Sequence, residues 1–365
     1  MAMALGLPMQ KPSHCRWLSR PDDALVQLAV VALMLVLHVW TTAAAEVGVP
    51  PMGLPGCPTT CGGITVPYPF GISPGCFLSG FNLTCDRSHN PPRLLFGDGA
   101  TGFEVTGIYL NNATMRLVSS AIINVTSKID GNNTYYSNWS LPSDGGGAFV
   151  LSYDHNRLVL VGCGLEGALA GSEMGYDANC STTCVLDDQR HWIPTKGGGC
   201  NECSGNGCCQ ANISKFFPFY IVSVWATSGR VDIDLMQDVV LIAEKGWIEG
   251  FWCRLGGALW PYYKPPTPDI SRVPVVLEWA MNSTLPVYPG IAPDYTSRCP
   301  VDGASSACKS SNSICVDINS VVRSGYMCQC SAGYYGNPYL VDGCRDGGIS
   351  GEELNYDFLN DDSED

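Results

Sequence analysis

Two pairs of acidic residues have the spacing that acid–base chemistry would need. Asp187 and Asp188 are adjacent, whereas Asp232 and Asp234 are two residues apart and would share one face of a strand. The sequence contains no His-Glu-x-x-His motif to accompany them, and its one Gly-x-Ser-x-Gly match, Gly71 to Gly75, falls on Ser73-Pro74-Gly75, which suits a tight turn. We therefore interpret both pairs as residues of solvated turns or strand edges, and we predict that the chain is not an enzyme and has no catalytic residues.

Cysteine is the other residue type that could carry chemistry, since Cys200-Asn-Glu-Cys203 has the spacing of zinc ligands or of a redox pair. The chain has 19 cysteines, and all but Cys15 follow residue 45. The remaining number is even, as a disulfide framework requires. We predict structural disulfides and no metal site, with the neighbouring Cys208 and Cys209 bonded to two different partners.

An apolar run at the N-terminus predicts export, the setting in which such disulfides form. Residues 24–40 are apolar, Arg16 and Arg20 precede them, and Ala43-Ala44-Ala45 follows. This pattern is typical of a signal peptide over residues 1–45, cleaved before Glu46. The alternative is a retained anchor, which would leave the protein membrane-associated. No second run of this kind occurs, so we expect no membrane span in the mature chain.

Glycosylation sequons and net charge further limit the kind of protein this is and the partners it can have. Eight Asn-x-Ser/Thr sequons predict a glycoprotein with these asparagines on its surface: Asn82, Asn112, Asn124, Asn132, Asn138, Asn179, Asn212 and Asn282. The formal net charge of −14 argues against nucleic acid as a partner. Residues 351–365 contain seven acids and no base, and we predict that residues 345–365 form an acidic disordered tail.

The elements that position these residues are predicted to be mostly β and disulfide-rich: tandem small β modules followed by a small C-terminal domain. Few charged residues and frequent Gly and Pro favour strands and turns over helices. Residues 219–225 and 273–279 are predicted strands, and residues 149–153 and 158–161 a predicted hairpin around a turn at 154–157. The predicted segments are 46–162, 163–285, a Pro-rich linker at 286–298, and 299–344.

The first module begins with residues 57–85, which hold four cysteines and a period-two alternation over residues 64–70. We predict two local disulfides and a half-buried strand in which Tyr68 and Phe70 face the core. Pro67 and Pro69 lack backbone N–H groups, so the strand is expected at a sheet edge that stays unpaired.

Three parts of the chain, taken in order, resemble the extracellular regions of plant wall-associated receptor kinases. The first is residues 57–85, with Tyr68-Pro-Phe-Gly-Ile and Gly75-Cys76, which look like that family's galacturonan-binding module. The second is similar to its central cysteine-rich module: Cys180-Ser-Thr-Thr-Cys184, Gly207-Cys-Cys209-Gln and Val275-Val-Leu-Glu-Trp279. The third, Cys299 to Cys344 with Gly336-Asn-Pro-Tyr339, has the epidermal-growth-factor-like (EGF-like) spacing. This spacing implies the pairs Cys299–Cys315, Cys308–Cys328 and Cys330–Cys344.

The resemblance implies binding of pectin, a galacturonic acid polymer, in the plant cell wall. Binding would need cations for the carboxylates, and the candidates are Arg87, His89, Arg93 and Arg116, which could equally be solvated surface charges. Tyr68, Phe70 and Phe81 could stack on sugars, but Tyr68 and Phe70 suit a core better, as do the aromatic residues of segment 247–263. The acidic chain would repel a polyanion unless a local basic patch or bridging Ca²⁺ intervenes. The EGF-like repeat lacks a calcium motif, so we expect no cofactor.

Two further interpretations stay open. The EGF-like domain could pair with a receptor kinase or a peptide, so that the protein acts as a co-receptor or decoy. Alternatively, the chain could be a truncated product of a receptor Ser/Thr kinase, since it has no His-Arg-Asp or Asp-Phe-Gly motif, and its Gly-x-Gly-x-x-Gly letters at 97–102 lack the Val of the kinase ATP loop. The main expectation is a secreted, cell-wall polysaccharide-binding glycoprotein that resembles a receptor ectodomain without a kinase.

Overall fold

The structure is a computed structural model, and its described residues all lie in one compact unit, Pro50–Asp365. They are residues 50–96, 103–119, 127–128, 134–141, 147–171, 175–183, 185–186, 192–193, 203–205, 207–215, 217, 219–227, 239–248, 272–284, 298–320 and 323–347. The predicted signal peptide, nearly all of the linker and the tail beyond residue 347 lie outside them. Within the described part, no helix is long and apolar enough to cross a membrane.

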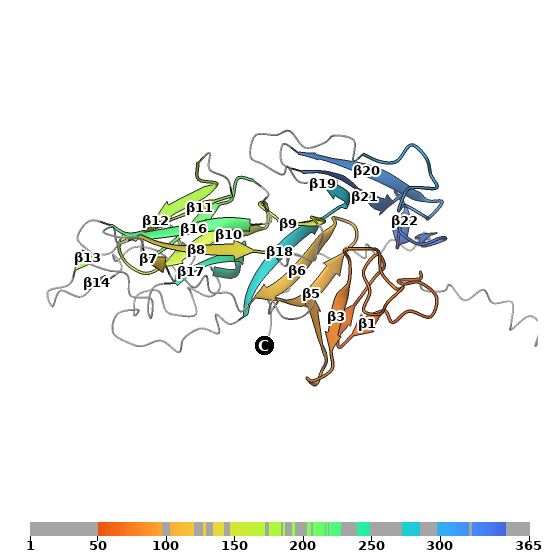
Figure 1. Cartoon of the computed structure of the whole chain (residues 1–365), viewed down its shortest axis with the longest axis horizontal. Helices are drawn as coiled ribbons and strands as arrows, with labels where there is room; N and C mark the ends of the chain where they lie inside the picture. The colour runs from red at the N-terminus through yellow and green to blue at the C-terminus, as the bar shows by residue number, and fades with distance from the viewer. Residues whose placement is uncertain are drawn as a thin grey trace, which may run out of the picture. The chain divides into compact units, whose positions relative to one another are not determined.

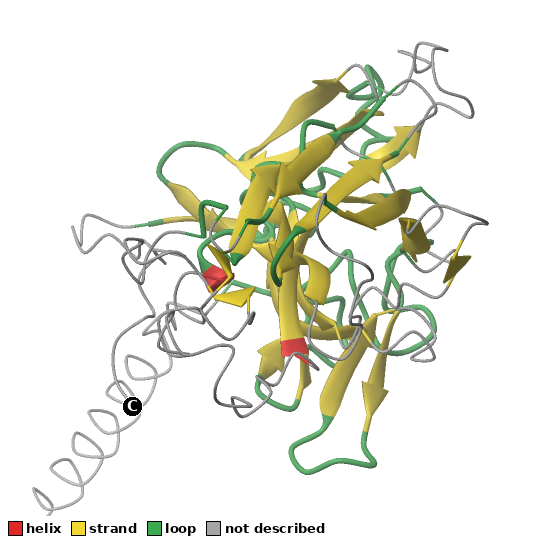
Figure 2. Cartoon of the chain, turned by 90° about the vertical axis from the view of Figure 1, so that its left-hand side faces the viewer, coloured by secondary structure: helices red, strands yellow, loops and turns green. Residues whose placement is uncertain are grey.

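Strands account for most of the described structure, and only short helical turns accompany them (Figures 1 and 2). Seven disulfides join described cysteines. The prediction of a mostly β, disulfide-rich fold is therefore confirmed. Cys208 bonds to Cys203 and Cys209 to Cys180, so the adjacent cysteines do have separate partners.

The largest sheet has six strands in the order β3-β4-β5-β6-β18-β9 (Figure 1). They are β3 (Leu83–Asp86), β4 (Arg93–Phe96), β5 (Phe103–Tyr109), β6 (Thr114–Ser119), β18 (Val273–Trp279) and β9 (Phe149–Leu151). The predicted strand at 273–279 has these same bounds. Its Val275, Leu277 and Trp279 are buried on one face and Val276 is buried on the other, as expected for a strand covered on both sides.

Two further sheets combine strands from both sides of the predicted boundary at 162/163. One has the order β12-β11-β16-β8-β7 and comprises β12 (Ala178–Ser181), β11 (Leu165–Ala170), β16 (Phe219–Ala226), β8 (Thr134–Ser140) and β7 (Ser127–Lys128). The other has the order β15-β10-β17 and comprises β15 (Cys208–Asn212), β10 (Asn156–Val161) and β17 (Val239–Glu244). Segments 46–162 and 163–285 therefore share sheets.

The predicted hairpin at 149–161 is wrong, because its two strands join different sheets. β9 pairs with β18, whereas β10 pairs with β15 and β17. The side chain of Asn156, which is fully buried, bonds to the backbone of Ser152 and to both the N–H and the carbonyl of Val276. The chain turns at residues 153–155, close to the predicted turn, but β10 then bonds to β18 through Asn156 and does not pair with β9.

The predicted edge strand over residues 64–70 is also wrong beyond its first two residues. Only β1 (Thr60–Cys61) and β2 (Ile64–Thr65) pair, as a short hairpin. The amide of Tyr68 donates to the carbonyl of Met52, and the amide of Phe70 closes a turn onto the carbonyl of Pro67. With two prolines lacking donors, the chain uses its remaining amides locally. The two local disulfides are present, as Cys57–Cys76 and Cys61–Cys85.

The C-terminal domain is built from two small sheets. The first has the order β19-β21-β20, with β19 (Met281–Thr284), β21 (Arg323–Cys330) and β20 (Ser313–Ser320), and the second pairs β22 (Tyr334–Gly336) with β23 (Cys344–Asp346). A separate two-stranded sheet, β13 (Val185–Leu186) with β14 (Trp192–Ile193), lies elsewhere in the chain. The disulfides are Cys299–Cys315, Cys308–Cys328 and Cys330–Cys344, the pairs that the EGF-like spacing implied.

One buried asparagine joins this domain to the first module. Asn337 Nδ2 donates to the carbonyls of Met52 (3.1 Å) and Tyr68 (2.7 Å), and its Oδ1 accepts from the amide of Tyr339 at 3.0 Å. The Tyr339 ring packs 5.8 Å from that of Trp279, which also contacts Phe70. The Gly336-Asn-Pro-Tyr339 motif therefore serves a contact within the chain.

Candidate functional site

Three of the predicted cations lie on the β3–β4 hairpin. Arg93 begins β4 directly opposite Asp86, whereas Arg87 and His89 are exposed in the loop between the two strands. The Cys61–Cys85 disulfide ties β3, near the loop end of this hairpin, to β1. At the β1–β2 turn, Gly62 has a φ of 60° and lies against the Pro92 carbonyl, where a Cβ atom would collide. The hairpin is therefore held in place from one side.

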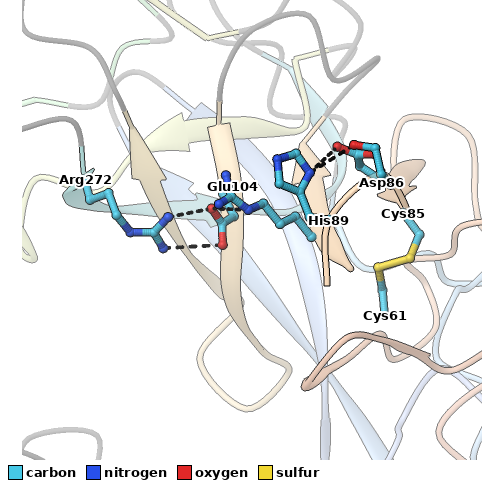
Figure 3. A network of polar contacts seen from close by, with 8 residues as sticks. Cys61, Cys85, Asp86, His89, Glu104 and Arg272 are labelled. Atoms are coloured by element: carbon cyan, nitrogen blue, oxygen red, sulfur yellow. Dashed lines mark hydrogen bonds and ion pairs between the residues drawn. A yellow bond between two sulfur atoms is a disulfide. The ribbon is translucent and has the colours of Figure 1, made fainter. Parts of the chain in front are cut away.

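Asp86 organises the loop that carries His89. Its Oδ1 accepts from the Ser88 amide at 2.8 Å, and its Oδ2 lies 3.0 Å from His89 Nδ1 (Figure 3). Hydrogen bonds from Ser88 are the main reason why the pKa of Asp86 lies below its usual value, and His89 adds to the effect. Asp86 is consequently ionised through the physiological range, and it orients the His89 ring.

Glu104 on β5 brings together two arginines that are distant in sequence. Arg272 Nη1 lies 2.9 Å from Glu104 Oε2 and Nη2 lies 3.4 Å from Oε1, so the guanidinium holds the carboxylate through two nitrogens (Figure 3). Arg93 Nε approaches the same carboxylate at 4.0 Å. Sequence reasoning missed Arg272, which is 168 residues from Glu104 and is marked only by its place before the strand at 273–279.

We call this set the charged face: Asp86, Arg87, His89, Arg93, Glu104 and Arg272. Its three guanidinium groups outnumber its two carboxylates, which leaves one net positive charge on a strongly acidic chain. Arg87 is exposed and has no hydrogen bond or ion pair with any residue that the structure describes. The charged face can therefore bind anions, and Arg87 is its most available donor.

The structure places the fourth predicted cation, Arg116, in a different setting. It shares a sheet face with Arg93 and Glu104 by register, but its Nε bonds to Glu244 at 2.7 Å. Glu244 ends β17 in the three-stranded sheet, so this ion pair links two sheets. Tyr109 lies nearby, and burial is the main cause of its raised pKa. Arg116 acts in packing between the sheets and is not part of the charged face.

The predicted aromatic candidates are mainly core residues. Phe70 and Phe81 are buried and pack edge-to-face at 5.2 Å. Tyr68 is half-buried, and its pKa is raised by burial. Trp247 packs beside a second apolar cluster, while the other aromatic residues of segment 247–263 lie outside the described residues. The interpretation of Phe70 as a core residue is confirmed, and Phe81 belongs to the core as well.

The structure also assembles a serine, a histidine and a carboxylate, but not as a catalytic triad. Ser152 Oγ donates to Glu278 Oε1 at 2.6 Å and lies 2.9 Å from His155 Nδ1. In a hydrolytic triad the carboxylate orients the histidine, whereas here it binds the serine, which is fully buried. Asp187, Asp188, Asp232 and Asp234 lie outside the described residues. The described part holds no group of three potential metal ligands.

Six of the eight sequon asparagines lie within the described residues. Asn112, Asn138, Asn179, Asn212 and Asn282 are exposed, and Asn82 is partly exposed. Asn124 and Asn132 lie outside this part of the chain. The six positions therefore offer the access that an attached glycan needs.

These features together define a mostly β, disulfide-stabilised protein with a charged surface face on its N-terminal hairpins. Residues 57–119, which carry the β3–β4 hairpin and Glu104, match the family model described as "Wall-associated receptor kinase galacturonan-binding". The chain is homologous over 80% of its length to wall-associated receptor kinases of Arabidopsis thaliana. Residues 57–119 therefore form a domain similar to the galacturonan-binding domain of wall-associated receptor kinases.

Two relatives illustrate the extent of the homology. Wall-associated receptor kinase 2 is 29% identical over 297 residues, and wall-associated receptor kinase 4 is 30% identical over 302 residues. The matched regions cover 34% and 35% of those relatives, so the chain spans about a third of their length. No solved structure matches the chain significantly.

Proposed function

We propose that the protein binds pectin in the plant cell wall, and that the charged face is where galacturonate carboxylates dock. The observation that carries this proposal is the bidentate contact of Arg272 with Glu104 inside a domain of the galacturonan-binding type. Arginine binds planar carboxylates through two parallel N–H donors. The charged face thus already holds a carboxylate in the way that a uronic acid would be held.

The arrangement also answers the electrostatic objection raised by the net charge of −14. Repulsion between exposed charges is screened beyond about 8 Å at physiological ionic strength, so the local charges decide the contact. Here the local balance is positive, and Arg87 contributes a guanidinium that no described residue neutralises. Ca²⁺ could lower the repulsion between polymer and chain further, but the proposal does not require it.

Binding of galacturonan oligomers to the glycosylated, oxidised protein tests the proposal. Arg87→Gln and Arg272→Gln should each weaken binding by about tenfold, since a hydrogen bond to a charged group contributes roughly 1.5–3 kcal/mol. Arg298→Gln is the matched control, because it removes the same charge from an exposed position directly before Cys299. Equal affinity in all four proteins would exclude the charged face as the docking site.

A protein partner for the C-terminal domain is the second candidate. Tyr334, Tyr335 and Val341 are exposed there, at 37%, 42% and 71%. Deleting residues 299–344 would not isolate this role, because Asn337 supports the first module. Tyr335→Ser with Val341→Ser is the cleaner change. Retained co-precipitation of a receptor kinase ectodomain by this double variant would argue against the second candidate.

Homology to receptor ectodomains supports an extracellular, cell-wall location for this chain. The seven described disulfides fit the same compartment, since such bonds persist in oxidising surroundings. We accordingly place the proposed binding event outside the cell and assign no chemical step to the protein. Mass spectrometry of the oligomers after incubation should find them intact, and shortened products would contradict this assignment.

A further inference from the structure

Exposed apolar side chains gather on one face of the five-stranded sheet. Phe219 and Ile221 on β16 are 48% and 44% exposed, although their neighbours Tyr220 and Val222 on the other face are buried. Tyr176, just before β12, is 61% exposed, and its ring centroid lies 6.3 Å from that of Trp225. A face of this kind on a secreted protein needs an occupant or a cover.

The register of the sheet places two glycosylation sequons on this same face. Asn138 on β8 is directly opposite Ile221, and Ser140, which completes the sequon, is directly opposite Phe219. Residues directly opposite one another in a sheet point to the same side, with Cβ atoms about 4.5–5.5 Å apart. An attached sugar at Asn138 therefore starts beside the two exposed apolar residues.

The second sequon lies on the other side of β16, on the edge strand β12. Asn179 on β12 pairs with Ala168 on β11, which pairs with Ser223 on β16. Asn179 is thus two strands, or about 10 Å, from the middle strand, and it is exposed. Between the two asparagines, Ala168 and Ser223 are buried, at 0% and 7% exposure, so the apolar surface open to the glycans is that of Phe219, Ile221 and Tyr176.

We propose that N-linked glycans on Asn138 and Asn179 lie along this face and cover its apolar residues. The C–H faces of the proximal N-acetylglucosamine units would pack on Ile221, Phe219 and the Tyr176–Trp225 pair, while their hydroxyl groups stay in water. The indole of Trp225 is already fixed by a 2.9 Å hydrogen bond from Nε1 to Glu166, so its ring is a rigid surface. These two glycans act as part of the fold, and this face is not the polysaccharide site.

This inference rests on export of the chain and not on pectin binding. The charged face lies on the six-stranded sheet, whereas the two glycans belong to the five-stranded sheet. A variant that loses pectin binding but keeps the glycan cover, or one that keeps pectin binding but loses the glycan cover, would therefore separate the two proposals.

Glycopeptide mass spectrometry and hydroxyl-radical footprinting of the protein from a plant secretory host test the proposal together. We expect glycans at Asn138 and Asn179, and low labelling of Phe219 and Tyr176 despite their exposure in the unmodified chain. Asn138→Gln should raise labelling of Phe219 severalfold, and Asn179→Gln should do the same for Tyr176. Unoccupied sequons, or labelling that ignores their removal, would overturn the proposal.

Two controls separate the glycan from the side chain that carries it. Ser140→Ala removes the same sequon but keeps Asn138, so it should reproduce the labelling change of Asn138→Gln. Asn212→Gln removes an exposed sequon from the three-stranded sheet and should leave Phe219 labelling unchanged. A rise in the Asn212 variant, or no rise in Ser140→Ala, would show that the effect does not come from a glycan on this face.

Discussion

Asn337→Asp tests how firmly the C-terminal domain is fastened to the first module. The two side chains have nearly the same shape, but a carboxylate cannot donate hydrogen bonds. Asn337 is fully buried, and its Nδ2 supplies both the 3.1 Å bond to Met52 and the 2.7 Å bond to Tyr68. The substitution therefore removes both donors while leaving the packing volume unchanged.

The cost follows from the groups left behind. Both backbone carbonyls lose the Asn337 donor, but that of Met52 still accepts from the Tyr68 amide, so the Tyr68 carbonyl is the group left unsatisfied, at about 1–3 kcal/mol. A buried, unpaired carboxylate would add to this, or it would take up a proton and recover one of the two bonds. We expect a loss of about 3–5 kcal/mol at neutral pH, which is a large part of the roughly 5–15 kcal/mol typical of folded proteins.

Urea unfolding followed by tryptophan fluorescence measures this loss, with Asn111→Asp as the control. Asn111 is exposed, so the same change of charge there should cost well under 1 kcal/mol. The Asn337→Asp variant should also regain stability as the pH falls, because its carboxyl group can donate one hydrogen bond once it is protonated. A loss for Asn337→Asp no larger than that of the control would refute the proposed role of this residue.

Three other substitutions have expected outcomes. Trp279→Phe should cost only about 1–2 kcal/mol in calorimetry despite complete burial, because Trp279 Nε1 has no hydrogen-bond partner among the described residues and its removal relieves that cost. Burial raises the pKa of Tyr339. The neutral Tyr339 phenol therefore stabilises the fold below about pH 10, and this stabilisation declines as the pH rises further. Tyr339→Phe should flatten the alkaline decline in the free energy of unfolding, measured by urea titrations at successive pH values. Replacing Cys61 and Cys85 by Ala opens a loop closed over a separation of 24 residues and should lower stability by about 3 kcal/mol in urea unfolding.

Local patterns in the sequence predicted individual elements well. The apolar run at 273–279 predicted β18 with its observed bounds, because a strand buried on both faces leaves a continuous apolar signal. The even cysteine count and its local clusters predicted the type of fold, since nearby cysteines in a secreted chain bond locally. Phe70 was rightly assigned to the core from the alternation around it.

Pairing between distant strands could not be predicted in the same way. The segment at 149–161 looks like a hairpin, and only the buried hydrogen bonds of Asn156 to Val276 show why its two strands part. The Pro67–Pro69 segment looks like an open edge, yet Asn337 donates to the Tyr68 carbonyl from 269 residues away. These contacts depend on one side chain each, and periodicity carries no signal of them.

The candidate site was predictable only where its residues lie close together in the sequence. Arg87, His89 and Arg93 follow Cys85 closely, so the hairpin brings them together. Arg272 reaches the charged face only because β18 joins the sheet of β5 through β6, and Arg116 is withdrawn by Glu244 from another sheet. A long-range ion pair leaves no mark in a single sequence.

Changing the balance of charge on the charged face tests the central claim most directly. Glu104→Gln removes the carboxylate that two arginines share and should tighten binding of galacturonan oligomers by about two- to fivefold, whereas Arg272→Gln should weaken it, since exposed charge pairs contribute up to about 1 kcal/mol. Isothermal titration at physiological ionic strength measures both. If the ion pair only stabilises the fold, both variants should bind more weakly. Opposite shifts are the result that carboxylate docking predicts, and weaker or unchanged binding by Glu104→Gln would contradict it.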